Sequence, residues 1–271
     1  MRPIGFAALM LAAAFALTIF SPRFLRTVRV DARTTSGSAP RTPVLIELFT
    51  SEGCSDCPPA DALLEKLDLS QPVPNAQVIV LSEHVTYWDD GGWRDPFSLQ
   101  DVTTRQGDYA SRFRLSGPYT PQMVVDGDSE FVGSDERRAL RVVEKAAELQ
   151  KIQVSLSAIR PEGDSSLTVH VESGTLGSPK PADILLAVAD ERDQSSVRHG
   201  ENAGRDLTHV AVVRTLTKIG KLDPGGAFSK DVKVSTANTN HQNLRIIAFI
   251  QETGDGRVLG IGAARFPDSA K

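Results

Sequence analysis

The expected fold is decided by one stretch, Phe49-Thr50-Ser51-Glu52-Gly53-Cys54-Ser55-Asp56-Cys57-Pro58-Pro59, which contains the only two cysteines of the 271 residues. A mostly apolar run at 44–49 precedes the cysteines and predicts a buried strand, and residues 60–67 after them predict a helix. The thiols are therefore expected at a strand-to-helix turn. Unpaired N–H groups and the macrodipole at a helix N-terminus favour a thiolate, the form that attacks disulfides or binds metal.

Composition excludes several classes of function. The formal net charge is −4 and the sequence pI is about 5.8, and no basic stripe lies beyond the N-terminal segment, so a nucleic-acid partner is not expected. Two cysteines are too few for a disulfide scaffold and favour one local redox or metal pair. The chain contains no phosphate loop and no dinucleotide fingerprint, so we expect no cofactor.

The N-terminus has the pattern of a targeting segment. The run from Ile4 to Phe20 is apolar and uncharged, so residues 1–22 are expected to form a signal peptide or a membrane anchor. The poor cleavage site after Phe20 favours an anchor, whereas the arginines that follow oppose export by the positive-inside tendency. We expect a periplasmic or extracytoplasmic location, with an inner-membrane tether as one alternative. Residues 23–43 are expected to form a linker.

Residues 44–150 are expected to form an α/β domain. A second apolar strand is predicted at 77–82, and its buried character is typical of parallel strands. The loop 83–96 after it contains both tryptophans and would share one sheet edge with the cysteines, although its aromatic side chains could instead fill the space between helix and sheet. Helices are predicted at 98–115 and, capped by Ser134, at 135–150; Asp126-Gly127-Asp128 predicts a hairpin between strands at 123–125 and 130–132.

Three ordered motifs carry a resemblance to a known family. Phrases of the type F-T-S-E-G-C-x-x-C-P-P, H-V-x-Y-W-D and Y-T-P-Q resemble those of an uncharacterised family of exported bacterial thioredoxin-like proteins, over about Val44 to Gln150. The resemblance implies a thioredoxin fold for 44–150, with Cys54 as the attacking thiol and Cys57 as the resolving thiol. It also implies a cis peptide bond at Pro121. Thr120, Tyr119 and Trp88 are the substrate-binding residues that we expect beside the disulfide.

The chain departs from the thioredoxin pattern near the cysteines. Gly53 stands where thioredoxins have an aromatic residue, and Leu48 stands where they have a buried acid. Glu47 is one residue away from that position, which turns its side chain to the other face of the strand. Asp56 lies between the thiols and opposes a thiolate. The direction of any redox reaction therefore stays open.

The second half, residues 151–271, is expected to be an all-β sandwich. Turn signals separate seven runs of strand length and none of them has a helical period. The polar segment 198–205 is interpreted as a solvated hairpin end, with a partner-binding loop as the alternative. The predicted strands are 152–159, 166–172, 184–189, 208–217, 227–234, 244–251 and 258–266.

These patterns favour a thiol-disulfide oxidoreductase that acts on the thiols of exported proteins or on a redox partner. One alternative is a copper-binding or carrier protein in which Cys54, Cys57 and His84 hold a soft cation. His84 could also tune the thiols or be an ordinary hydrogen-bonded residue at a strand end. The further alternative is a non-catalytic binding module.

Overall fold

The computed structural model describes residues 41–237, 239, 243–253 and 256–266. They belong to one compact unit, Ser38–Lys271. The predicted signal peptide or anchor and most of the linker lie outside the described residues. Within the described ranges no helix is both long and apolar enough to cross a membrane.

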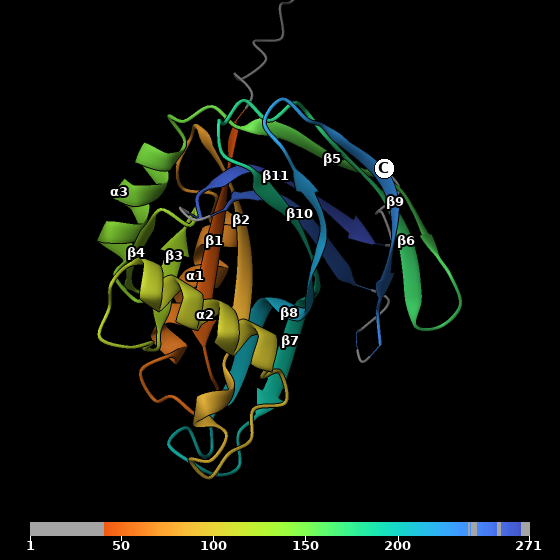
Figure 1. Ribbon diagram of the computed structural model, residues 1–271. Helices are drawn as coiled ribbons and strands as arrows, with labels where there is room; N and C mark the ends of the chain where they lie inside the picture. The colour runs from red at the N-terminus through yellow and green to blue at the C-terminus, as the bar shows by residue number, and fades with distance from the viewer. Residues whose placement is uncertain (1–40, 238, 240–242, 254–255, 267–271) are drawn as a thin grey trace, which may run out of the picture. The chain divides into compact units, whose positions relative to one another are not determined.

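The first half of the chain contains the predicted helices and four strands (Figure 1). The predicted hairpin between strands Gln122–Val125 and Ser129–Val132 is confirmed, since Asp126 and Gly127 have φ values of 49° and 63° as its turn requires. The cap of the helix Glu136–Ala146 is Asp135, whose side chain accepts from the amide of Arg138, and not Ser134 as predicted. The elements are β1 (Thr42–Thr50), α1 (Pro58–Ser70), β2 (Ala76–His84), η1 (Thr86–Trp88), α2 (Gln100–Arg112), β3 (Gln122–Val125), β4 (Ser129–Val132) and α3 (Glu136–Ala146).

The second half contains the seven predicted strands, two of them much longer than expected. Their bounds are β5 (Ile152–Pro161), β6 (Ser166–Ser173), β7 (Ala182–Ser196), β8 (Asp206–Leu222), β9 (Phe228–Ser235), β10 (Leu244–Glu252) and β11 (Val258–Phe266). The hairpin of β7 and β8 extends well beyond the runs predicted at 184–189 and 208–217. Its end reaches the cysteine turn, as described below.

The eleven strands of the described residues form one mixed sheet in the order β4-β3-β1-β2-β8-β7-β10-β11-β5-β6-β9. β1 and β2 are parallel, β3 is antiparallel to β1, and β7, β8 and β10 pair in antiparallel fashion. The two halves join where β2 runs parallel to β8, with Ser82 opposite Val212. If the first half formed a sheet of its own, β2 would be an edge strand. Its pairing with β8 makes it an interior strand.

The expected fold class, a thioredoxin-like α/β domain followed by an all-β sandwich, is wrong. The sheet runs through both halves, and no thioredoxin-like domain is evident as a separate body. The physical reason is a shared core on one face of the sheet. Apolar side chains of β1, such as Phe49, and of α2, such as Tyr109, pack there with Val213 of β8 and Phe249 of β10.

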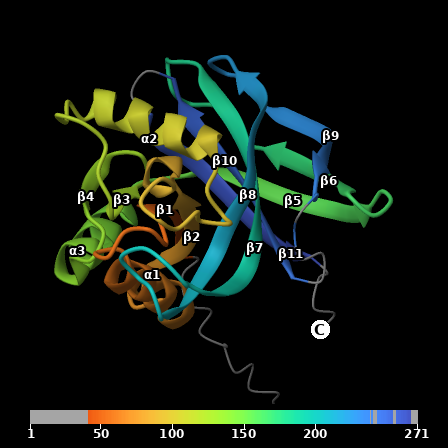
Figure 2. The ribbon, with the colours of Figure 1, turned by 90° about the horizontal axis from the view of Figure 1, so that it is seen from below.

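Strand β1 separates two cores because its side chains alternate. Val44, Ile46 and Leu48 face α1 and α3, whereas Leu45 and Phe49 face α2 and the strands of the second half. Figure 2 shows α1 and α3 on one side of β1 and β2, with α2 on the other. The end of β1 thus delivers the cysteine turn to the α1 side of the sheet.

Candidate functional site

Cys54 and Cys57 form a disulfide at the start of α1, with their Cα atoms 5.4 Å apart. Cys57 has helical dihedrals and is the N-cap residue. Pro58 and Pro59 follow it without N–H groups, and the amide of Ala60 donates to the carbonyl of Cys57. The helix start therefore has few unpaired backbone N–H groups, fewer than the sequence led us to expect. A thiolate at this turn would receive little direct hydrogen bonding from them. The two cysteines are 1% and 0% exposed.

The predicted prolyl loop lies beside the cysteine turn. The Thr120-Pro121 peptide bond is cis, as the resemblance implies. Trp88 links the two segments, because its indole Nε1 donates to Thr120 Oγ1 at 2.7 Å and its backbone packs against Gly53. The hydroxyl of Tyr119 instead donates to Glu130 of β4 at 2.6 Å, so its phenol is turned toward that strand. Three of the expected residues, Trp88, Thr120 and Pro121, are thus brought together with the disulfide.

A loop from the second half covers the cysteines. It comprises residues 197–205 between β7 and β8, and we call it the covering loop; Figure 1 shows it at the lower end of the sheet, beside the turns after β1 and β2. The buried Asn202 donates through Nδ2 to the carbonyls of Glu52 and Cys54, both at 2.8 Å. Glu201 accepts from the amide of Ser55 at 3.1 Å. The segment is the end of the β7–β8 hairpin and most of its residues are exposed, as predicted, but the buried Asn202 also ties it to the cysteine turn.

A cluster of buried polar groups lies under the same turn, and we call it the imidazole cluster. His209 of β8 has Nε2 3.3 Å from Glu52 Oε1 and Nδ1 3.8 Å from Asp61 Oδ2. Glu52 also accepts from Trp93 Nε1 at 2.8 Å and from the hydroxyl of Ser195. In the described part of the chain, Asp61 Oδ1 and His209 Nδ1 have no hydrogen-bond partner.

His84 and Asp95 complete the imidazole cluster. His84 Nδ1 lies 2.7 Å from Asp95 Oδ2, and the rings of His84 and His209 meet edge to face with centroids 4.7 Å apart. Burial opposes ionisation of Asp95, but His84 and the amides of Glu52 and Phe97 outweigh it and lower the pKa of Asp95 to about 2. Burial likewise opposes the charged form of His84, yet Asp95 and the other carboxylates raise the pKa of His84 overall.

Asp61 differs from Asp95, since burial raises its pKa against the opposing effect of His209 and His84. Its carboxyl therefore holds a proton more readily than an exposed aspartate does.

The geometry of the site does not support the copper-binding alternative. Throughout the described ranges, no group of three or more His, Cys, Asp and Glu side chains is placed to hold a metal ion. The ring of His84 is instead paired with Asp95, and both sulfurs are in the disulfide. We therefore assign no ligand role to Cys54, Cys57 or His84.

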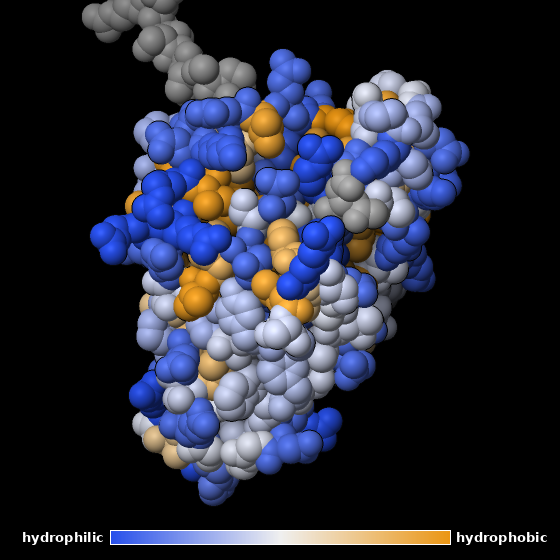
Figure 3. All heavy atoms as spheres, turned by 60° about the vertical axis from the view of Figure 1, so that its left-hand side comes forward, coloured by the Kyte–Doolittle hydropathy of each residue, from blue (hydrophilic) through white to orange (hydrophobic). Residues whose placement is uncertain are grey.

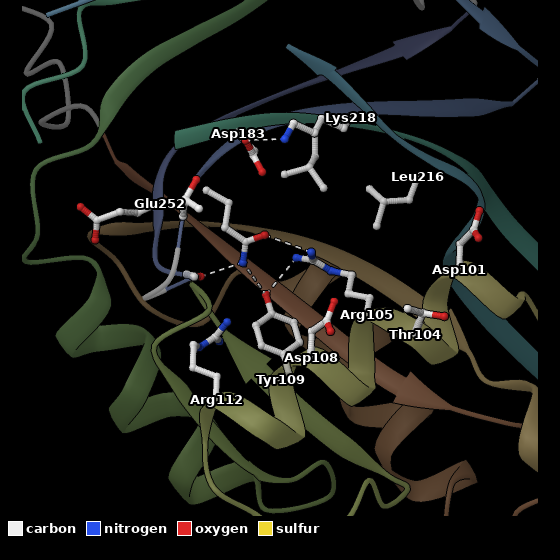
Figure 4. A pocket seen from close by; sticks show the side chains of 14 residues that line it. Asp101, Thr104, Arg105, Asp108, Tyr109, Arg112, Asp183, Leu216, Lys218 and Glu252 are labelled. Atoms are coloured by element: carbon white, nitrogen blue, oxygen red, sulfur yellow. Dashed lines mark hydrogen bonds and ion pairs between the residues drawn. The ribbon is translucent and has the colours of Figure 1, made fainter. Parts of the chain in front are cut away.

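A second set of buried charges lies on the α2 face, and we call it the arginine cluster. Arg105 Nε donates to Glu47 Oε1 at 2.6 Å, the hydroxyl of Tyr109 donates to Glu47 Oε2 at 2.6 Å, and Glu83 Oε2 is 3.9 Å from Arg105 Nε. Gln251 of β10 bonds both Arg105 and Tyr109. Figure 4 shows Arg105 and Tyr109 of this cluster at the wall of a cavity of about 480 Å³. Glu47 thus faces away from the cysteines.

The surface offers no broad apolar face in the view that turns α3 and β4 forward. Figure 3 shows mostly hydrophilic side chains there, with small separate hydrophobic areas. The exposed large apolar side chains of the described residues are Leu69, Tyr87, Val132 and Leu149.

A family model described as a protein of unknown function, DUF1223, matches residues 45–251. The chain belongs to the DUF1223 family. The match covers both halves of the sheet, whereas the motifs behind the expected resemblance end near Gln150. Membership of the thioredoxin-like superfamily is not part of this finding. No curated protein matches the DUF1223 chain.

Solved structures include one that is similar to this DUF1223 protein over most of its length. The crystal structure of protein AGR_C_4864 from Agrobacterium tumefaciens has a TM-score of 0.64 and 25% identity, and the match covers 85% of this chain and 97% of that one. The sporulation control protein Spo0M of Bacillus subtilis has a TM-score of 0.30, 12% identity and coverage of 45% and 51%. That second likeness is too weak to support an argument.

Sequence reasoning missed most of the imidazole cluster in this DUF1223 protein. Asp61 follows Cys57 by one helical turn, a spacing that could have been noticed. His209, Ser195 and Asn202 are more than 130 residues away along the chain, as the separations of 143 to 157 residues from Glu52 record. Only the glycine-containing phrase at 198–205 marked that region at all.

Proposed function

We propose that this protein is an exported thiol-disulfide oxidoreductase whose exchanging pair is Cys54 and Cys57. The observation that carries the proposal is the disulfide at the start of α1 beside the Thr120-Pro121 bond and Trp88. A structural staple gains most by closing a long loop, and the separation here is only three residues. A short pair at a helix start is instead typical of reactive cysteines.

The proposed partners are thiols of exported proteins or a redox protein. A disulfide persists in an oxidising compartment, which agrees with the periplasmic or extracytoplasmic location expected from the N-terminal sequence. Both cysteines are buried, and the covering loop is bonded to the Cys54 carbonyl, so we expect substrate access to require movement of that loop. Trp88 and Thr120 would then border the opened site.

The test is the reduction potential of the full chain, equilibrated in glutathione buffers and read by alkylation of Cys54 and Cys57. We expect a potential between about −270 and −120 mV, the range of exchanging pairs, and a mixed disulfide with glutathione in Cys57→Ser but none in Cys54→Ser. A bond that stays oxidised below about −300 mV, with no mixed disulfide in either variant, would refute the proposal.

A further inference from the structure

The leaving sulfur of this disulfide lies in a place that cannot stabilise a charge well. Cys57 is fully buried, the two prolines after it supply no N–H, and the amides of Ala60 and Asp61 are already bonded to its own carbonyl. A thiolate formed there would have few hydrogen-bond donors and little contact with water. Exchange at this site therefore needs a nearby group that delivers or accepts a proton.

Asp61 is placed to be that group. It follows Cys57 by four residues, the Asp61 amide donates to the Cys57 carbonyl at 3.1 Å, and Cys57 itself has helical dihedrals. Side chains four apart on a helix lie on the same face, with Cβ atoms about 5–6 Å apart. Both side chains are buried, and the Oδ1 atom of Asp61 lacks a hydrogen-bond partner within the described ranges.

We infer that Asp61 exchanges a proton with the Cys57 sulfur during disulfide exchange, and that His209 from the second half of the chain positions Asp61. This inference rests on the proposed function and adds a role for β8. His209 lies between Asp61 and Glu52, and Glu52 is fixed in turn by Trp93 and Ser195. The groups that act on Asp61 are His209 on β8, His84 on β2, the hydroxyl of Thr50 on β1 and Asp95 in the loop after η1, whereas Glu52 lies beside His209.

Reduction of the disulfide begins when a thiolate of an exported protein attacks Cys54 Sγ. The Cys54–Cys57 bond breaks, and a mixed disulfide forms on Cys54. The electron pair leaves on Cys57 Sγ, which takes the proton of the Asp61 carboxyl. Asp61 regains a proton from solvent, where the ionising substrate thiol has released one. A second substrate thiolate then attacks the substrate sulfur, so two thiols are oxidised to one disulfide and the protein pair is reduced.

In the reverse direction Asp61 accepts the proton of Cys57. Cys57 must lose its proton before it attacks a mixed disulfide on Cys54, because the thiolate is the nucleophile. The carboxylate of Asp61 takes that proton, and burial raises its pKa toward that of a thiol. The resolving step is therefore the one that isolates the role of Asp61.

The experiment uses the reduced full chain, mixed with oxidised glutathione, and measures how fast the mixed disulfide on Cys54 resolves between pH 5 and 9. We expect Asp61→Asn to slow resolution at pH 7 by about 10²-fold, with the deficit shrinking as alkali ionises Cys57 directly. His209→Gln should shift the midpoint of the pH profile. Asp108→Asn, which removes an exposed carboxylate of α2, is the matched control and should resolve at the wild-type rate.

The outcomes separate the two proposals. Wild-type protein that forms no mixed disulfide with glutathione refutes the proposed function and the role of Asp61 together. Normal exchange with an unchanged rate and pH profile in Asp61→Asn overturns only the role of Asp61. If Asp61→Asn does not fold, the wild-type profile decides: a rate that rises only through about pH 8.5, the ordinary thiol range, shows that Cys57 ionises unaided.

Discussion

The two buried charge clusters flank the same strand and differ in their cations. In the arginine cluster, Glu47 and Glu83 share Arg105, which keeps its charge at any pH that the fold survives. In the imidazole cluster, Glu52 and Asp61 face His209. Imidazoles gain and lose protons near neutral pH. The first cluster is therefore suited to hold β1 and α2 together, and the second to exchange protons.

The clusters also differ in what lies over them. The arginine cluster borders an open cavity of about 480 Å³ (Figure 4) on the α2 face of the sheet, opposite the face that α1 covers. The imidazole cluster lies under the disulfide and the covering loop. Buried ionisable groups alone do not identify a functional site. The imidazole cluster is the better candidate because a disulfide lies beside it.

The largest effect is expected when the arginine cluster loses its cation. Arg105→Met leaves Glu47 and Glu83 buried without a counter-charge, which should lower the free energy of unfolding by about 3–5 kcal/mol at pH 7. The measurement is denaturant unfolding. Lys218→Met is the control: it removes a cation from the same cavity, but Lys218 is 54% exposed, so the change should stay within about 1 kcal/mol. Equal losses of stability in both variants would contradict the expectation that Arg105 is the counter-charge that Glu47 and Glu83 need.

The next effect is smaller and opposite in sign. Burial and the neighbouring Glu47 raise the pKa of Glu83 well above 4.5 in the folded chain, so its contribution to stability is complete below about pH 4.5 and is lost as the pH rises toward the folded value. Glu83→Gln removes this loss. Its stability relative to wild type should therefore increase from pH 4.5 to pH 8.

Unfolding midpoints at several pH values would check the role of Glu83. Glu144→Gln, which changes an exposed residue of α3, should follow the wild-type profile. Parallel profiles for Glu83→Gln and wild type would show that Glu83 does not titrate in this window.

The local elements of this fold were predictable, whereas its pairing was not. Apolar runs and turn residues predicted the three α-helices and the strands of the described residues, though not the short helix η1, because those signals lie within a few residues of each other. The pairing of Ser82 with Val212 joins segments about 130 residues apart, and a continuous apolar strand such as β2 looks the same with one neighbour or two. The separate sandwich was therefore the wrong expectation.

The candidate site divides in the same way. Cys54, Cys57, Trp88 and Pro121 carry recognisable local motifs, and the structure brings them together. His209 and Asn202 have no motif around them, and their roles depend on a hairpin whose length was underestimated. Long-range pairing thus decided which residues surround the disulfide.

The covering loop provides a way to expose the imidazole cluster. Asn202 donates to the carbonyls of Glu52 and Cys54, and losing both bonds should favour the open loop by about 1 kcal/mol. Asn202→Ala should then speed reduction of the disulfide by dithiothreitol about fivefold. His199→Ala, an exposed change in the same loop, should leave the rate unchanged. An unaltered rate in Asn202→Ala would mean that the loop does not limit access.

The smallest effect is expected from the exposed carboxylate of Asp56, in contrast to the buried carboxylate of Asp61. Asp56 lies inside the motif but is exposed, so water and salt screen its action on the sulfurs. In a Cys57→Ser background, Asp56→Asn should lower the pKa of the Cys54 thiol by about half a unit or less, measured from the pH dependence of alkylation. The direction follows because a nearby carboxylate opposes the thiolate, and about 0.5 M salt should abolish the difference. An effect on the Cys54 pKa that persists in high salt would mean that Asp56 acts by direct contact. The difference in burial would then no longer explain why Asp61, and not Asp56, acts on the sulfurs.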